Sequence, residues 1–459
     1  MVILVIRDVD RSPMQAGKGE GQRRGLGKGA HAMVLGADGR VTNPRPGLAA
    51  AATVRVSLVA LEGEGREDAA AAARALWRLH RCATDEGLGV SAGLSASGAG
   101  GGMADGTIVA ACGALERWLD DYDVCWAACE LLQELVRCFR EGRAVALEVG
   151  AADRVARALL RHHSTAKRRR AKMQGRGEGR PFPQVSFAGC QVLRALVRHH
   201  RDSGRTAAYV ADSHGAQAVV ETLAAASVME EDVAAIALST LVEMLPPEDH
   251  GGVDPSGSGA MGGGSMSARR AVLKAGAVDA AVGAMRGLPK SLAVQEQGVR
   301  FLGTIVSMGH AENRESAAIA VARAGGITAI LTALLRHPRT DPADGRCSTT
   351  HYFGIWALHG IACCGDEQPA GQGRAGRILL RQSVGKILTQ VGPARGGEGR
   401  SEHEGGAAEL LAVREKHSAN RTLVKWCEEL LDVADEILGE QREMAWRAGS
   451  TGPSALQNA

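Results

Sequence analysis

Residues 324–362 read AGGITAILTALLRHPRTDPADGRCSTTHYFGIWALHGIA. The stretch opens with the small-residue corner Ala324-Gly325-Gly326, and an apolar stripe follows that ends in two leucines. After a loop, helical spacing returns at 354–362. Glycine suits such a corner because it can adopt φ > 0 after a helix. The pattern predicts a corner at the end of one helix, followed by two more helices that cannot bury their apolar stripes alone.

The same pattern recurs earlier in the chain. A small-residue corner is followed each time by an amphipathic segment, and then by a longer segment with small and apolar residues at helical spacing. Segments that alternate apolar and polar residues are almost absent, so we expect an all-α protein. The further corners lie at 149–152, 213–216 and 275–278.

A corner, a helix ending in two leucines and a third helix of the form Ala-x-x-x-Leu together resemble the armadillo repeat family. The resemblance implies a right-handed α-solenoid of about six repeats over residues 48–391. The corners are further apart than the usual period of about 40–47 residues, which implies long loop insertions. A HEAT-type solenoid is the close structural alternative. The clearest copies are 324–362 and 275–308, weaker ones are 141–200 and 205–245, and partial ones are 48–83 and 107–139.

The segments outside the repeats differ in composition. Residues 1–47 are basic and rich in glycine and lack apolar periodicity, so we expect a disordered leader. Residues 392–406 are predicted to be a linker, residues 407–447 C-terminal capping helices and residues 448–459 a disordered tail. A free, partner-binding helix is the alternative to the cap. The predicted apolar stripe of the cap consists of Leu423, Cys427, Leu430, Ala434 and Ile437.

Composition limits the classes of function. Hydrophobic residues make up 45% of the chain and aromatic residues only 3%, which suits thin layers of small-residue helices. The 54 basic and 51 acidic residues nearly cancel, and this balance disfavours nucleic-acid binding. The ten cysteines form no paired pattern, so we expect a reducing, cytoplasmic setting, with the nucleus as the alternative. No secretion signal and no membrane insertion are predicted, because apolar runs are too short.

Motifs for catalysis are missing from the sequence. It contains no phosphate-binding loop, no His-Glu-x-x-His and no Cys-x-x-Cys, so we expect no enzyme, no cofactor and no metal site. The histidine pairs 162–163 and 199–200 are predicted to lie about 20 Å apart at opposite helix ends. Cys125, Cys129 and the pair 363–364 are expected to be small buried hydrophobes, with a metal or redox role as the alternative.

A basic cluster lies in the predicted insertion after the third repeat's second helix. It has two interpretations, a solvated loop or a nuclear-localisation signal. No aromatic residue interleaves with the charges, as base stacking on single-stranded nucleic acid would require. The cluster consists of Lys167, Arg168, Arg169, Arg170 and Lys172.

In armadillo proteins the third helices line a concave surface, and the resemblance implies two surface positions per helix. The charges on these positions are mixed, which favours a heteropolar, extended peptide over a uniformly charged one. Import adaptors of the family repeat Trp and Asn there, whereas this chain has Trp twice and no Asn. The predicted positions are Trp77 and Arg81, Glu130 and Glu134, Gln191 and Ala195, Ser239 and Glu243, Arg300 and Thr304, and Trp356 and Gly360.

The sequence therefore predicts a scaffold that binds protein partners along this surface. A nuclear transport or adaptor protein is the alternative, and a lyase-type enzyme built on helical repeats is a remote one.

Overall fold

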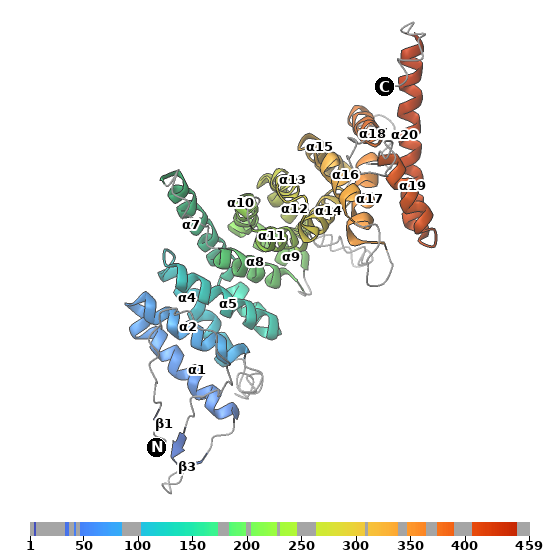
Figure 1. The fold of residues 1–459 in the computed structure, drawn as a ribbon. Helices are drawn as coiled ribbons and strands as arrows, with labels where there is room; N and C mark the ends of the chain where they lie inside the picture. Colours follow the sequence, from blue (N-terminus) through green and yellow to red (C-terminus); the bar gives the residue numbers. More distant parts are fainter. Residues whose placement is uncertain are drawn as a thin grey trace, which may run out of the picture.

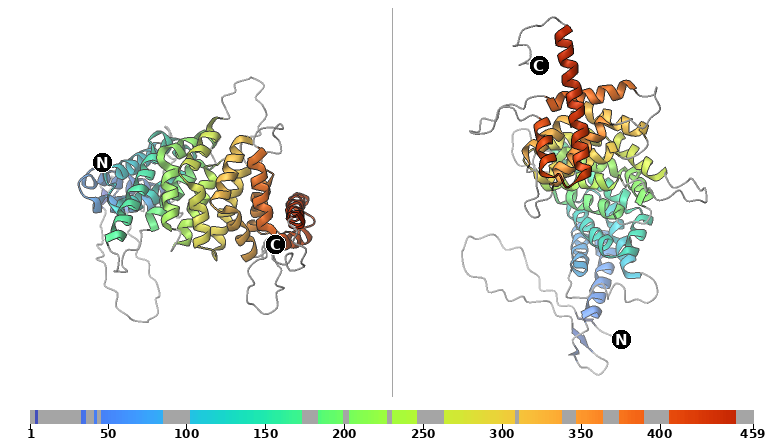
Figure 2. Two further views of the ribbon diagram at one scale, coloured as in Figure 1. Left: turned by 90° about the horizontal axis from the view of Figure 1, so that it is seen from above. Right: turned by 90° about the vertical axis from the view of Figure 1, so that its right-hand side faces the viewer.

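In the computed structural model, the described residues are 4–5, 33–35, 41–42, 46–84, 102–172, 183–198, 203–226, 230–245, 263–307, 311–337, 347–363, 374–389 and 406–447. Helices dominate this part of the chain and stack in sequence order into one elongated array (Figure 1). Two further views show the same row of layers (Figure 2).

The helices of the N-terminal half are α1 (Pro46–Glu62), α2 (Ala69–Thr84), α4 (Gly102–Arg117), α5 (Tyr122–Cys138), α6 (Arg140–Glu148), α7 (Ala151–Lys172), α8 (Pro183–Val197), α9 (Ser203–Val210), α10 (Ala216–Ala226) and α11 (Glu231–Glu243). Those of the C-terminal half are α12 (Gly263–Lys274), α13 (Ala277–Gly287), α14 (Leu292–Ser307), α15 (Ala311–Arg323), α16 (Gly326–Arg336), α17 (Thr349–Ala362), α18 (Arg374–Thr389), α19 (Gly406–Lys416) and α20 (Arg421–Arg447). Two short turns, η1 (Glu64–Arg66) and η3 (Ala211–Gly215), join α1 to α2 and α9 to α10.

The helices form layers of one repeating kind. Each full layer has a first, a second and a third helix, as in α12, α13 and α14. Third helices pack on third helices in the order α2, α5, α8, α11, α14, α17 and α20, and second helices pack in the order α1, α4, α7, α10, α13, α16 and α19. Seven layers can therefore be traced through the described residues. The all-α solenoid expected from the sequence is confirmed.

The corners have the backbone conformation that the sequence predicted. Gly150, Gly276 and Gly325 adopt φ values of +71°, +81° and +76°, each where a first helix turns into a second helix. His214 takes the equivalent place between α9 and α10 with φ +62°. Only glycine adopts this region without steric cost, which explains the recurring glycine at the corners.

Replacing Gly276 by Ala is expected to lower the free energy of unfolding by about 1 kcal/mol. A Cβ there would meet no atom within 4 Å, so the cost comes from the positive φ alone. Gly283 of the adjoining α13 is the matched control, because its Cβ would also meet nothing, and its backbone is helical. Gly283→Ala should raise the free energy of unfolding by about 0.5–1 kcal/mol. Denaturant unfolding of both variants checks the opposite signs, and equal effects would contradict the prediction.

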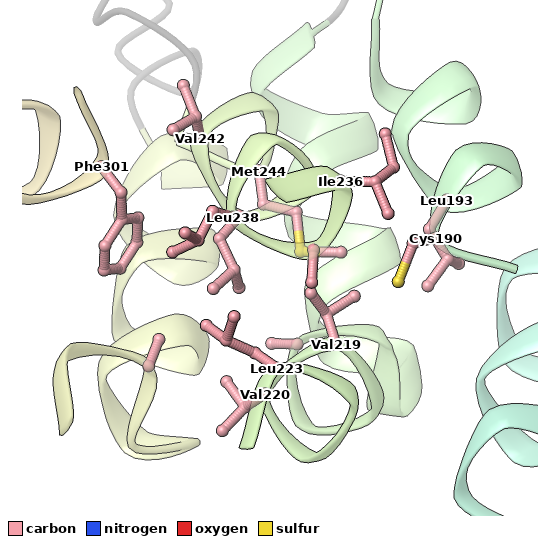
Figure 3. Close-up of a cluster of buried hydrophobic side chains, with 14 of the residues drawn as sticks. Cys190, Leu193, Val219, Val220, Leu223, Ile236, Leu238, Val242, Met244 and Phe301 are labelled. Carbon is pink, nitrogen blue, oxygen red and sulfur yellow. The ribbon is translucent and has the colours of Figure 1, made fainter. Parts of the chain in front are cut away.

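The core is one continuous cluster of buried hydrophobic side chains that lies between the layers. It consists mainly of Ala, Val, Leu and Ile, and Phe301 is among its largest fully buried members. Figure 3 shows Phe301 of α14 next to Leu238 and Val242 of α11, with Leu223 of α10 below them. The low aromatic content thus reflects thin layers that touch only their neighbours.

Three details differ from the sequence-based expectations. Within the predicted leader, β1 (Leu4–Val5), β2 (Met33–Leu35) and β3 (Val41–Thr42) form a small antiparallel sheet in the order β1-β2-β3. These strands are rich in β-branched residues, which favour extended backbone. Helix α1 begins at Pro46 instead of residue 48, and α7 continues through residues 164–172, where we expected a loop. The α7 end projects from the array (Figure 1).

The predicted cap is itself a layer. Helices α18, α19 and α20 pack on α15, α16 and α17 respectively, and the second and third helices of the earlier layers pack on their predecessors in the same way. All five stripe residues predicted for the cap are buried. The predicted linker and tail, residues 392–406 and 448–459, lie outside the described residues except for Gly406, which begins α19.

Among the described helices, none is both long and apolar enough to cross a membrane by itself. The pair Arg314–Arg323 and Gly326–Arg336 is long and apolar enough when the two are taken together, but it is bent by 73°.

Candidate functional site

The seven third helices α2, α5, α8, α11, α14, α17 and α20 present one continuous face, which we name the third-helix surface. All but one of the predicted partner-binding side chains reach solvent on these helices. Arg81 is exposed and the others are partly exposed, whereas Thr304 is only 4% exposed.

At the N-terminal end of this surface, aromatic rings join two layers. The Trp77 ring of α2 meets the Trp126 ring of α5 edge-on, with centroids 4.9 Å apart. The indole N–H of Trp126 donates a hydrogen bond to Glu130 at 3.1 Å. Trp77 and Glu130 therefore belong to one cluster that bridges the first two layers.

Glu134, one turn further along α5, is held by two neighbours on its own helix. Arg137 donates to both carboxylate oxygens, at 2.5 and 3.1 Å, and the Cys138 thiol lies 3.0 Å from Oε1. Partial burial by itself raises the pKa of Glu134, but the hydrogen bonds from Arg137 and Cys138 and the charges of Arg137 and His80 outweigh it, so the net shift is downward. The carboxylate is therefore charged and preorganised at neutral pH.

In the middle of the surface, Arg194 of α8 and Arg198, the residue that follows this helix, reach the next layer. Arg194 donates to Ser239 of α11 at 3.2 Å, and Arg198 lies 3.9 Å from Glu243. Burial and the nearby charge of Arg198 lower the pKa of Arg194. The spacing of four on both helices places the two contacts on one face.

Towards the C-terminal end, Arg300 of α14 lies over the ring of Phe353 of α17, 5.7 Å from its centroid. The prediction that Thr304 faces a partner is wrong. The helices α14 and α17 approach closely here, since a Cβ on Gly303 would meet the Trp356 ring at 2.8 Å, and this close packing covers Thr304.

Trp356 both packs between two layers and reaches solvent. It packs on Gly303 between layers, yet it is partly exposed and lines a cavity of about 570 Å³. Trp426 of α20 lies in the same cavity wall. The remaining lining residues are Val306, Ser307, Arg314, His359, Gly360, Cys363, Arg381, Lys425, Glu429, Asp432 and Val433.

The sequence frame missed several residues of this surface. Trp126 could have been found, because it precedes Glu130 by four positions and so shares its helix face. Arg194, Phe353 and Trp426 could not have been found in this way. Each of them contacts or faces residues of a neighbouring layer, and the sequence does not show how neighbouring layers are offset.

The other residues singled out from the sequence have varied surroundings. The side chains of the basic cluster 167–172 and residues 199–200 and 364 lie outside the described residues. His163 is bonded to Thr222 at 2.7 Å, so its ring serves packing between α7 and α10. Cys125 and Cys129 are fully buried, and burial raises the pKa of Cys125 to about 12 and holds that of Cys129 well above its ordinary value. Both thiols are therefore protonated at neutral pH and behave as small hydrophobes.

A Ser–His–carboxylate chain also occurs at α17. Ser348 caps this helix and its Oγ lies 2.9 Å from Nδ1 of His351, whose Nε2 lies 3.1 Å from Glu409 of α19. All three residues are at most 6% exposed. A substrate could not reach this serine in the folded chain, so the arrangement ties α17 to α19.

No protein-family model and no curated protein matches the sequence. Solved structures with related folds include an engineered protein from a structural genomics consortium, with 16% identity and a TM-score of 0.44, covering 67% of this chain and 95% of that one. A designed armadillo repeat protein in complex with the peptide (KR)4 has 12% identity and a TM-score of 0.43, covering 71% and 99%. A structure concerned with the interaction between cadherin and beta-catenin has 13% identity and a TM-score of 0.28, covering 88% and 86%.

The fold is identified from the packing of the helical layers and not from these distant likenesses. Its recurring glycine corners, its ordered second and third helices and its continuous core identify an all-α solenoid of armadillo-like helical repeats.

Proposed function

We propose that the chain is a protein-binding scaffold that holds an extended, heteropolar peptide segment along the third-helix surface. The observation that supports it best is the row of partly exposed aromatic and charged side chains that successive third helices supply. These side chains are preorganised, because bridges such as Arg194 to Ser239 and Arg300 to Phe353 already fix their positions. Preorganised side chains lose little conformational entropy on binding.

The chemistry of the row indicates the kind of partner. Acidic side chains dominate α5, with Glu130 and Glu134, while Arg194 lies on α8 and Arg300 on α14. Arg81 on α2 and Glu243 on α11 belong to the same surface, so a partner that runs along the array would meet positive and negative groups in alternation, followed by the cavity with Trp356 and Trp426. A heteropolar segment with acidic and basic residues along its length and an apolar end is complementary to this order.

The test uses the full chain and a peptide selected from a random displayed library, whose affinity is measured by fluorescence anisotropy. Trp356→Ala is expected to weaken binding at least about thirtyfold, as loss of about 2 kcal/mol at a hot-spot tryptophan implies. Arg157→Ala is the control, because Arg157 lies on the second helix α7 and pairs there with Asp153. It should leave affinity unchanged.

Stability is followed in parallel, since Trp356 also packs on Gly303. Affinity is compared at temperatures where both proteins are folded by circular dichroism. If Trp356→Ala and Arg300→Ala both leave the affinity intact, the third-helix surface is not the binding face.

A further inference from the structure

Three residues with metal-binding side chains meet in the wall of the cavity. His359 and Cys363 lie four positions apart at the C-terminal end of α17, so they share one helix face. Glu429 comes from α20, and its Oε2 is hydrogen-bonded to His359 Nε2. The ligand atoms of all three residues lie within 4.8 Å of one another. The sequence could not show this cluster, because 70 positions separate His359 from Glu429.

Imidazole, thiolate and carboxylate are the ligand types that Zn²⁺ takes in proteins, with bond lengths of about 2.0–2.3 Å. Ligand atoms around a tetrahedral zinc therefore lie about 3.4 Å apart. From separations within 4.8 Å, shifts of about 1 Å per side chain reach this geometry, which rotamer adjustments of partly exposed residues supply.

Two cationic side chains near the cluster, Lys425 and Arg381, are both paired with carboxylates. Lys425 pairs with Oε1 of Glu429 at 3.6 Å and leaves Oε2 for the metal. Arg381, which also lines the cavity, is paired with Glu436 at 2.7 Å. The Trp426 ring lies next to the His359 ring, with centroids 5.8 Å apart. The cavity provides an entry path and room for a fourth ligand such as water.

We propose that His359, Cys363 and Glu429 bind one Zn²⁺ ion, with an open fourth position towards the cavity. The ion would join α17 to α20, the last two third helices, and add a Lewis-acidic group to the C-terminal end of the third-helix surface. The proposal concerns metal binding and stands whether or not a peptide binds elsewhere on that surface.

The test is a titration of the full, reduced chain with Co²⁺, whose thiolate complexes absorb in the near ultraviolet. We expect a thiolate-to-cobalt band that saturates at one equivalent and disappears when Zn²⁺ displaces the cobalt. Loss of an outer-sphere group around a metal usually weakens binding about 10- to 100-fold, so loss of a direct ligand should cost at least as much. Cys363→Ser should abolish the band, and His359→Ala and Glu429→Gln should weaken binding at least about tenfold.

Cys138→Ser is the matched control. Cys138 likewise lies at a helix end and is more exposed than Cys363, and its thiol is 3.0 Å from a carboxylate oxygen of Glu134, but it has no place in the cluster. This variant should bind cobalt as the parent does. The proposal is overturned if no saturable band forms, if Cys363→Ser keeps the band, or if Cys138→Ser removes it. Hydrogen exchange gives an independent readout, because Zn²⁺ should slow exchange at the end of α17 and in α20 of the parent and of Cys138→Ser, but not of Cys363→Ser.

Discussion

Replacing Glu409 by Ala is expected to lower the free energy of unfolding by about 3–5 kcal/mol, the range for removing one partner of a buried, hydrogen-bonded pair. The Glu409 side chain is 7% exposed, and its His351 partner is completely buried. Without the carboxylate, His351 Nε2 would be left in the core with neither this partner nor water. Chemical denaturation measures the loss, and hydrogen exchange should locate it in α19 and α17.

Glu409→Gln is the control for this prediction, since a glutamine keeps an oxygen that accepts from His351 while it removes the charge. Its loss should be clearly smaller than that of the alanine variant. Equal losses for Ala and Gln would show that packing volume, and not the hydrogen bond to His351, holds α19 in place.

Replacing Phe301 by Ala is expected to cost a similar amount, about 3–5 kcal/mol, because it opens a cavity in the middle of the array. Phe301 is fully buried on α14, which packs between α11 and α17. Layers of a solenoid interact only with their neighbours, so damage at this point weakens the coupling between the two halves. We therefore expect the thermal transition to divide into two, one for the N-terminal layers and one for the C-terminal layers.

Phe301→Leu keeps most of the apolar volume, and it should preserve a single transition with a loss of about 1–2 kcal/mol. Calorimetry of the three proteins provides the measurement. A single, unshifted transition for the alanine variant would mean that the layers around α14 do not depend on this side chain.

The elements that the sequence predicted best are those set by local chemistry. The corners at Gly150, Gly276 and Gly325 follow from the need for positive φ, and the stripe from Leu423 to Ile437 follows from helical periodicity. His214 shows the limit of that rule, because it adopts the same positive-φ conformation although it is not a glycine.

The contacts that the sequence did not predict depend on how the helices of one layer are offset against those of the next. The pairing of Trp77 with Trp126 and the meeting of His359 with Glu429 require knowledge of how one helix is offset against the next. Burial of Thr304 has the same origin, since it results from the close approach of α17 at Gly303. Local periodicity identifies the face of a helix, but the offset depends on side chains far away in the sequence.

The contact between Trp77 and Trp126 has an optical consequence. Two indole rings at 4.9 Å and 83° couple their electronic transitions, and such coupling gives circular dichroism in the aromatic region that single indoles lack. Because this coupling falls steeply with distance, the signal weakens when the rings separate, even while both helices remain folded. The first two layers thus carry a native spectroscopic reporter of their own separation, distinct from the signal of total helix content.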